Sequence, residues 1–319
     1  MEQKKSVWML LKTTVMQWFE DQPFLLASSL SYYTLFSLAP LLIIVIAIAG
    51  LAFGHEAAQQ QIVGTIQGTI GEQSAQAVQG MIENASSQPK TGIISAVIGI
   101  VALIFGAAGV VGQLQTSLNT IWGVEPKPGQ GVWGFIRQRF ISFAMVLGLG
   151  FVLLVSLVIS AVVASLSNYI GSFFGGAEVI AHGLDLVISF LLVTVLFAMI
   201  YKFLPDVKIE WRDVWIGAAL TSVLFTLGKF LIGLYLGHSG VSSTYGAAGS
   251  LITVLLWVYY SSLIFFLGAE FTQVYATRYG SGMAPAEHAE PLAYRQRETP
   301  SPETRTELSR NRAVRRPAN

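Results

Sequence analysis

Apolar residues gather into six runs along this chain, and each run is long enough to cross a bilayer as a helix. The runs cover roughly residues 24–53, 92–121, 140–166, 180–204, 214–237 and 247–275. A helix needs about 20 apolar residues to span the hydrocarbon core, and the longer runs leave room for tilt or for helix beyond the bilayer. The pattern predicts an all-α fold, a polytopic integral membrane bundle of six transmembrane helices that occupies residues 23–280.

Two further segments show helical periodicity but are too polar to span. Residues 1–22 are expected to form an N-terminal amphipathic helix that lies in the cytoplasmic interface. Its apolar face comprises Val7, Trp8, Leu11, Val15, Trp18 and Phe19. Residues 54–90 repeat isoleucine at helical spacing and break near Gly71, which predicts short outer-side helices that form an extracytoplasmic cap.

The distribution of charge predicts the orientation of the bundle. Only 12% of the residues are charged and 53% are hydrophobic, whereas soluble domains carry about 25% charged residues. Of the 19 Lys and Arg residues, 17 lie before the first run, between the second and third, between the fourth and fifth, or after the sixth. Positive loops stay in the cytoplasm, so both termini are expected inside. Residues 281–319 are rich in Pro, Arg, Glu and Thr, which predicts a disordered cytoplasmic tail.

Three ionisable residues fall inside the apolar runs: Asp185, Lys229 and Glu270. Such residues face the interior of a bundle or water, and they usually pair. Asp185 and Lys229 lie in the same leaflet by helical rise, so Asp185 is the expected partner of Lys229, while Glu270 lies near the inner surface. Two interpretations stay open: a structural ion pair, or a snorkelling lysine, on one side, and the charged lining of a substrate or ion path on the other.

Hydroxyl and amide side chains cluster at the predicted inner ends of runs one, two and six. The candidates to line a cavity open to the cytoplasm are Ser29, Tyr32, Tyr33, Ser37, Gln113, Asn119, Tyr259 and Tyr260. The alternative is that these groups only hydrogen-bond neighbouring helices to one another.

Proline and small residues mark places where helices are expected to kink or to approach closely. These residues are Pro40, Gly106, Gly109, Gly112, Gly246 and Gly249.

Three blocks of sequence carry a family resemblance. They are ASSLSYYTLFSLAPLLIIVIAIAG, FLPDVKIEWRDVWIGAALTSVLFTLGKFLIGLYLG and STYGAAGSLITVLLWVYYSSLIFFLGAEF. They resemble the YihY/BrkB family of bacterial inner-membrane proteins, and the similarity covers roughly residues 5–280. The resemblance implies a six-helix inner-membrane protein with an inside N-terminus, and it places Lys229 in a GK motif and Glu270 in a GAE motif. Members of the family have been called virulence factors, and many carry an old label as ribonuclease BN.

The residues argue against an enzyme. The chain has no cysteine and four histidines, so thiol chemistry is excluded and no metal or other cofactor is expected. RNA hydrolysis needs a metal-binding cluster or an acid–base pair, and the pattern supplies neither. A permease or exporter of a small solute, lipid or ion is expected, with a non-transporting envelope-maintenance or scaffold protein as the alternative. The expected partners are membrane lipids and an unknown small-molecule or ion substrate, with no specific nucleic acid; a homo-oligomer stays open.

Overall fold

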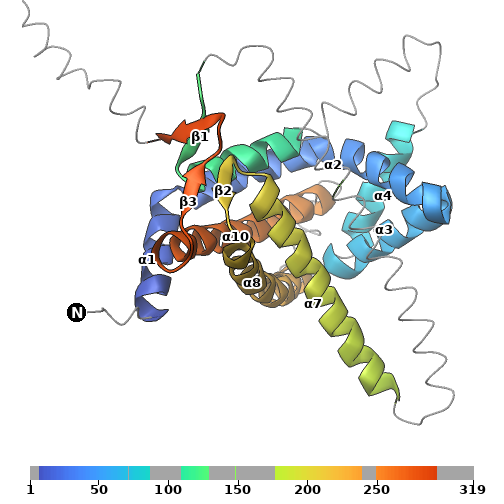
Figure 1. Ribbon diagram of the computed structural model, residues 1–319. Coiled ribbons are helices and arrows are strands. Elements are labelled where there is room, and N and C mark those ends of the chain that lie inside the picture. The colour runs from blue at the N-terminus through green and yellow to red at the C-terminus, as the bar shows by residue number, and fades with distance from the viewer. Residues whose placement is uncertain are drawn as a thin grey trace, which may run out of the picture.

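The structure, a computed structural model, describes residues 7–70, 72–86, 109–128, 148, 177–238 and 249–292, which are mostly helical (Figure 1). The labelled helices are α1 (Val7–Glu20), α2 (Pro23–Phe53), α3 (His55–Ile70), α4 (Glu72–Ser86), α7 (Ala177–Phe203), α8 (Trp211–His238) and α10 (Gly249–Arg278). Residues 109–121 form a further helical stretch. Four short strands complete the fold: β1 (Val124–Pro126), β2 (Val207–Ile209), β3 (Met283–Pro285) and β4 (Ala289–Pro291).

Three of the described helices are long and apolar enough to cross a membrane: Pro23–Leu51 in α2, Trp211–Tyr235 in α8 and Gly249–Arg278 in α10. Val187–Phe203 in α7 is a shorter apolar helix. The count of six spans stays a prediction, because most of the two runs between α4 and α7 lies outside the described residues.

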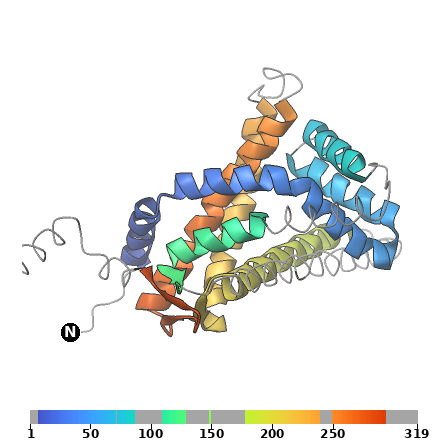
Figure 2. The same ribbon diagram turned by 90° about the horizontal axis from the view of Figure 1, so that it is seen from above.

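Helices α1 and α2 meet at a sharp corner (Figure 2). Gln22, between them, has φ 53° and ψ 55°, a left-handed conformation that residues other than glycine rarely adopt. Pro23 then begins α2, where its fixed φ suits the first helical turn and its missing N–H is not needed. Pro40 lies inside α2 and removes one intrahelical hydrogen bond, and α2 bends part-way along its length, as a proline kink would produce.

Helix α1 exposes most of the apolar face that the sequence predicts. The side chains of Val7 and Trp8 are 71% and 75% exposed, and Leu11 and Val15 are exposed as well. Trp18 differs, because it packs against the main core at the end of α1 nearest α2. An uncovered apolar face is what an interfacial helix needs; its contact with lipid stays a prediction.

Helices α8 and α10 pack through two matched contacts between glycine and threonine. A side chain at Gly217 of α8 would overlap Thr272 of α10, and a side chain at Gly268 of α10 would overlap Thr221 of α8. Each threonine donates its hydroxyl to the carbonyl four residues earlier, Thr221 to Gly217 and Thr272 to Gly268, both at 2.7 Å. We call these four residues the glycine–threonine clasp; small residues of this kind let membrane helices approach closely.

Tyr201 connects a third helix, α7, to α8 and α10. Its side chain is fully buried, and its hydroxyl lies 3.1 Å from Thr221 Oγ1 and donates to the Phe265 carbonyl at 2.8 Å. Phe197, one turn earlier, packs edge-on against Phe225 of α8 with ring centroids 5.4 Å apart. Helices α7, α8 and α10 therefore form one interlocked unit.

Helices α3 and α4 fold back on the second half of α2 as a two-helix cap (Figures 1 and 2). Helix α3 ends at Ile70 and α4 begins at Glu72, where the sequence predicts a break between two helices. The cap has its own small core, formed by Ile46, Ala49, Ala58, Val78 and Ile82. The side of the membrane on which it lies stays a prediction.

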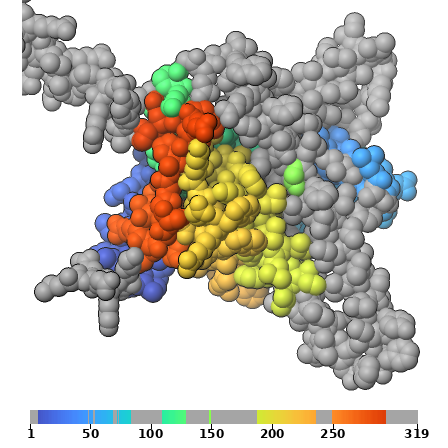
Figure 3. Space-filling view, in the orientation of Figure 1, coloured from blue at the N-terminus to red at the C-terminus, as the bar shows by residue number. Residues whose placement is uncertain are grey.

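The chain after α10 is ordered where the sequence predicts disorder. Strand β3 pairs antiparallel with β2, and β4 pairs antiparallel with β1. In Figure 3 this orange-red segment lies against the yellow surface of α7 and α8, with the green residues of the β1 region beside it. The predicted boundary at 281 is therefore wrong for residues 281–292, because composition does not register the backbone partners that two remote loops provide. Residues 293–319 lie outside the described residues.

These pairings bring together four segments that lie far apart in the sequence. Helix α1, β1, the α7–α8 connection with β2, and the chain from the end of α10 through β4 all meet at one end of the bundle. We call this the basal end. The charge count assigns the same four segments to one side of the membrane, so the two observations agree on which segments lie together; that this side is the cytoplasm stays a prediction.

Candidate functional site

Glu270 is a buried carboxylate of α10 at the basal end. Its side chain is 1% exposed, and among the described residues its Oε2 has no hydrogen-bond partner. Gly268 faces α8, so a residue two positions later points away from α8, toward the side on which α1 packs. The described charges that act on Glu270 are those of Asp21 and Glu20, both acidic.

Asp21 supplies a second carboxyl group at this place. It follows α1 directly, and its side chain lies within hydrogen-bonding reach of the Glu270 side chain. Burial raises the pKa of Asp21; the hydrogen bond with Glu270 opposes the rise, and the negative charge of Glu20 adds to it. Two carboxyl groups this close hold one proton between them more readily than two negative charges.

Three more buried polar atoms near this pair have no hydrogen-bond partner among the described residues: Gln17 Oε1, Trp18 Nε1 and Gln273 Oε1. Gln17 lies one turn before Asp21, and Gln273 lies one turn after Glu270, so each shares a helix face with a carboxyl group. We call these five residues the acid junction. Buried polar groups are normally hydrogen-bonded, so the junction can accept water or another small polar partner.

A second buried carboxylate at the basal end, Asp206, is well satisfied. It accepts hydrogen bonds from Gln115 Nε2 at 3.2 Å and Asn119 Nδ2 at 2.8 Å, and its own N–H donates to Asn119 Oδ1 at 2.8 Å. His288 Nε2 lies 2.9 Å from Asp206 Oδ1. Asp206 thereby ties the 109–121 helix, the α7–α8 connection and the C-terminal segment together, so its role is structural.

Asp213, in the first turn of α8, makes a similar tie. It is 2% exposed and accepts hydrogen bonds from the Ser281 N–H at 2.9 Å and the Ser281 hydroxyl at 2.7 Å. The three buried carboxylates of the basal end thus divide into two that hold segments together and one, Glu270, that has an oxygen without a partner in the described part of the chain.

Lys229 is exposed on α8 within the described structure. The Tyr201–Thr221 and Phe197–Phe225 contacts set the antiparallel register of α7 and α8, and the same register extends to place Lys229 level with position 193. Position 185 is eight residues further along α7, or about 12 Å at 1.5 Å per residue. The side chain of Asp185 lies outside the described residues, so the predicted ion pair stays a prediction, and this register does not favour it.

Comparison with known proteins identifies the family over most of the chain. The family model described as "Virulence factor BrkB" matches residues 14–293. The chain belongs to the BrkB family.

Relatives of this BrkB-family protein are described as UPF0761 membrane proteins. The one from Aeromonas salmonicida is 29% identical over 77% of this chain and 81% of its own length. The one from Mannheimia succiniciproducens is 29% identical over 78% of this chain and 83% of its own length. The one from Albidiferax ferrireducens is 32% identical over 78% of this chain but only 58% of its own, longer, length. No solved structure matches.

The predicted cavity-lining residues on α2 of this BrkB-family protein do not share one environment. Tyr32 and Tyr33 are 61% and 44% exposed, whereas Ser37 is buried. Ser37 and the Tyr33 ring lie against Gly109 of the 109–121 helix, and Ser29 is half-buried. Ser37 and Tyr33 thus contribute to a helix contact.

The other four predicted cavity residues also occupy separate places. Asn119 belongs to the hydrogen-bond network of Asp206, and Gln113 is half-buried on the same helix. Tyr259 packs against the main core, while Tyr260 lies against α8. Asn119, Tyr259 and Tyr260 thus meet other segments of the described fold, and the role of all four residues in a cavity stays a prediction.

The glycines that the sequence marks for close packing differ in their surroundings. A side chain at Gly109 would crowd α2, whereas nothing described lies within 4 Å of one at Gly112. Gly249 is buried at the start of α10. Gly106 and Gly246 lie outside the described residues.

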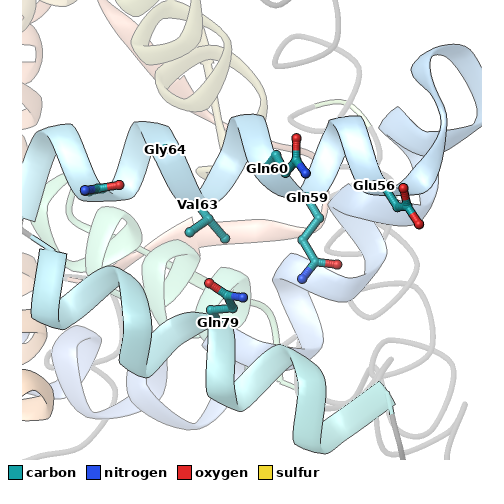
Figure 4. A pocket seen from close by; sticks show the side chains of 7 residues that line it. Glu56, Gln59, Gln60, Val63, Gly64 and Gln79 are labelled. Carbon is teal, nitrogen blue, oxygen red and sulfur yellow. The ribbon is translucent and has the colours of Figure 1, made fainter.

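The cap of this BrkB-family protein carries an open hollow of about 320 Å³ between α3 and α4, lined by Glu56, Gln59, Gln60, Val63, Gly64, Gln67 and Gln79. In Figure 4, Gln59 and Val63 point from α3 toward α4, and Gln79 points back. The sequence did not single out these residues. They line an open polar groove in the cap, which contains no residue of the acid junction.

Sequence reasoning found Glu270 but missed Asp21, Asp206 and His288. Asp206 stands in a block that carries the BrkB-family resemblance, FLPDVKIEWRD, so the block itself was a signal for that residue. No comparable signal marks Asp21 or His288. Among the described residues, no three His, Cys, Asp or Glu side chains gather as a metal site.

Proposed function

We propose that this protein is a permease or exporter that moves a small solute, lipid or ion across the bacterial inner membrane. The observation that supports this most is Glu270, a buried carboxyl group in a spanning helix; one of its oxygens has no partner among the described residues, and its described charged neighbours are acidic. Ionisable residues inside membrane helices are costly and mark ion or substrate paths. A bundle that only needed stability would do better with an apolar residue at this position.

The packing suggests which part of the molecule moves. Helices α7, α8 and α10 interlock through the glycine–threonine clasp and Tyr201, which suits a fixed frame. Helix α1 contacts that frame mainly through α10 and is joined to α2 by a strained corner. We place the path between α2 and the basal half of α10, with α1 covering its cytoplasmic end and both chain termini inside.

A second candidate is a non-transporting scaffold protein that maintains the envelope. The observation that favours it is the set of hydrogen bonds around Asp206 and Asp213, which would make the basal end rigid. In either case we propose a protein without enzymatic activity, surrounded by membrane lipids, and without a specific nucleic-acid partner.

A transport screen in proteoliposomes tests the proposal. Full-length protein is reconstituted and offered labelled amino acids, sugars, organic acids, monovalent ions and fluorescent lipids, beside protein-free vesicles. The control variant is Glu210→Gln, which changes an exposed acid at the basal end. We expect wild type and Glu210→Gln to move at least one class faster than protein-free vesicles, and Glu270→Gln to lower that rate about tenfold, as expected for a loss of about 1.4 kcal/mol.

Two results would contradict the proposal. One is a folded wild-type protein that moves none of these classes faster than empty vesicles. The other is a Glu270→Gln variant with the wild-type rate, which would leave transport without the residue that supports it.

A further inference from the structure

Three carboxyl groups at the α1–α10 contact form a series from the surface to the interior. Glu20, the last residue of α1, is exposed; Asp21 is half-buried; and Glu270 is 1% exposed. Asp21 lies within hydrogen-bonding reach of Glu270 and feels the charge of Glu20. The half-buried Asp21 thus lies between water and the buried Glu270.

The backbone at this contact is held in an uncommon conformation. Gln22 adopts φ 53° without being glycine, and such conformations persist where surrounding contacts determine them and are common at functional sites. The left-handed residue turns the chain from α1 into α2, directly after the carboxyl group of Asp21. The corner and the acid pair thus belong to one local structure.

We infer that the acid junction is a proton-binding site, in which one proton held between Asp21 and Glu270 keeps the end of α1 docked on α10. On binding, an O–H bond forms on one carboxylate and the other carboxylate accepts its hydrogen bond, so the charge of the pair falls from −2 to −1. On release, the proton returns to water from the half-buried Asp21, and the two carboxylates repel each other across the α1–α10 contact.

The surrounding groups favour a proton over other ligands. The unpartnered Oε2 of Glu270, buried beside Asp21, lacks a donor among the described residues, and a proton supplies one. A divalent metal would need further His, Cys, Asp or Glu ligands, and no such group of three exists in the described part of the chain. Gln17, Trp18 and Gln273 offer buried polar atoms to water at the same contact.

The other described charged groups near this end are hydrogen-bonded to other residues or exposed to solvent. Asp213 of α8 is hydrogen-bonded to Ser281, and Lys12 of α1 and Arg278 of α10 are exposed. Glu20 and Asp21 are thus the described charges that act on Glu270. Because burial raises the pKa of Asp21 above its unfolded value of about 4, the docked state is favoured at low pH and is lost as pH rises through the raised pKa.

This inference deepens the proposed function. It rests on that function only in the assumption that proton binding is coupled to transport. Binding of a proton is measured without any gradient or transported solute, so a negative flux screen and a negative proton titration are separate results.

Infrared difference spectroscopy on the full-length protein in lipid nanodiscs tests the site. Ordinary Asp and Glu side chains lose their protons near pH 4, so a protonated carboxyl C=O band that persists above about pH 6 reports a shifted group. We expect this band in wild type and in Glu210→Gln, a weaker band in Glu270→Gln, where only the half-buried Asp21 remains, and a shift of the band to lower pH in Asp21→Asn. Two variants at the junction keep the test decisive if one of them does not fold.

Spin labels report the docking of α1. The chain has no cysteine, so Met16→Cys on α1 and Thr277→Cys on α10, both exposed, can be labelled without further changes. We expect the distance between them to lengthen or broaden as pH rises in wild type and to stay constant in Glu270→Gln.

Two results would overturn the inference. One is a band that is unchanged in both Glu270→Gln and Asp21→Asn. The other is the absence of the band in wild type. If, in that second case, the melting temperature of wild type rises in sodium chloride relative to choline chloride and the rise is lost in Glu270→Gln, the junction is assigned to sodium.

Discussion

At Gly217, hydrogen is the only side chain that fits beside Thr272. We therefore expect Gly217→Ala to destabilise the protein, because overpacking costs about 1–3 kcal/mol and here the added methyl overlaps a threonine that is itself hydrogen-bonded. The gain in helix propensity, at most about 1 kcal/mol, does not offset this overlap. The measurement is the apparent melting temperature in detergent, followed by tryptophan fluorescence.

The same helix offers a matched control. Nothing described lies within 4 Å of a side chain at Gly233, so Gly233→Ala should keep or raise the melting temperature through helix propensity alone. Adding Thr272→Gly to Gly217→Ala removes the overlap and should recover part of the loss. Equal melting temperatures for Gly217→Ala and Gly233→Ala would show that the clasp does not hold α8 to α10.

At the scale of single residues, the sequence reveals what is unusual but not what it touches. Glu270 stands out because it is a carboxylate in an apolar run. Asp21 does not stand out, because acids are common where a helix ends beside a turn, and its partner lies almost the whole chain away. Asp206 shows the same limit, since its amide partners come from a different helix. Pair chemistry of this kind depends on long-range packing.

At the scale of elements, residues 281–292 join the basal end through β3, β4 and their side chains. A chain truncated after Gly280 loses both strand pairs, the His288 partner of Asp206 and the Ser281 partner of Asp213. We expect it to melt well below wild type, because a buried acceptor left without its donor costs about 1–3 kcal/mol. The measurement is the melting temperature, with the recovered yield of monodisperse protein.

A chain truncated after Leu292 is the control, because it keeps every one of those contacts. Its melting temperature should match that of wild type. If both truncated chains have the melting temperature of wild type, the C-terminal strands contribute nothing to stability. The hydrogen bonds around Asp206 then do not stabilise the basal end.

Helices and strands differ in how far the sequence could predict them. Long apolar runs predict α2, α8 and α10, and the break that the sequence predicts near Gly71 falls between the end of α3 and the start of α4. Strands β1–β4 have three residues each, which is too short for an alternating pattern to emerge. Their partners lie in remote loops, so tertiary pairing, not local propensity, creates them.

At the scale of the whole molecule, two independent patterns agree. The positions of Lys and Arg divide the chain into alternating sides, and the structure gathers the four segments of one side at the basal end. Charge patterning therefore predicted which segments share a side, although it could not predict that they bind one another. The ordered contact among them gives α1 a surface to dock on, which the periodicity of α1 alone did not indicate.

The agreement leads to a test of orientation that this cysteine-free chain makes direct. Gln60→Cys on α3 and Ala284→Cys on β3 are both exposed positions, one in the cap and one at the basal end. Because positive loops are retained in the cytoplasm, a membrane-impermeant maleimide should label Gln60→Cys in intact spheroplasts and Ala284→Cys only after lysis. Labelling is scored by gel shift, and a permeant maleimide checks that both thiols react. The reverse pattern would invert the topology and would move the acid junction, with the source of its proton, to the outer face.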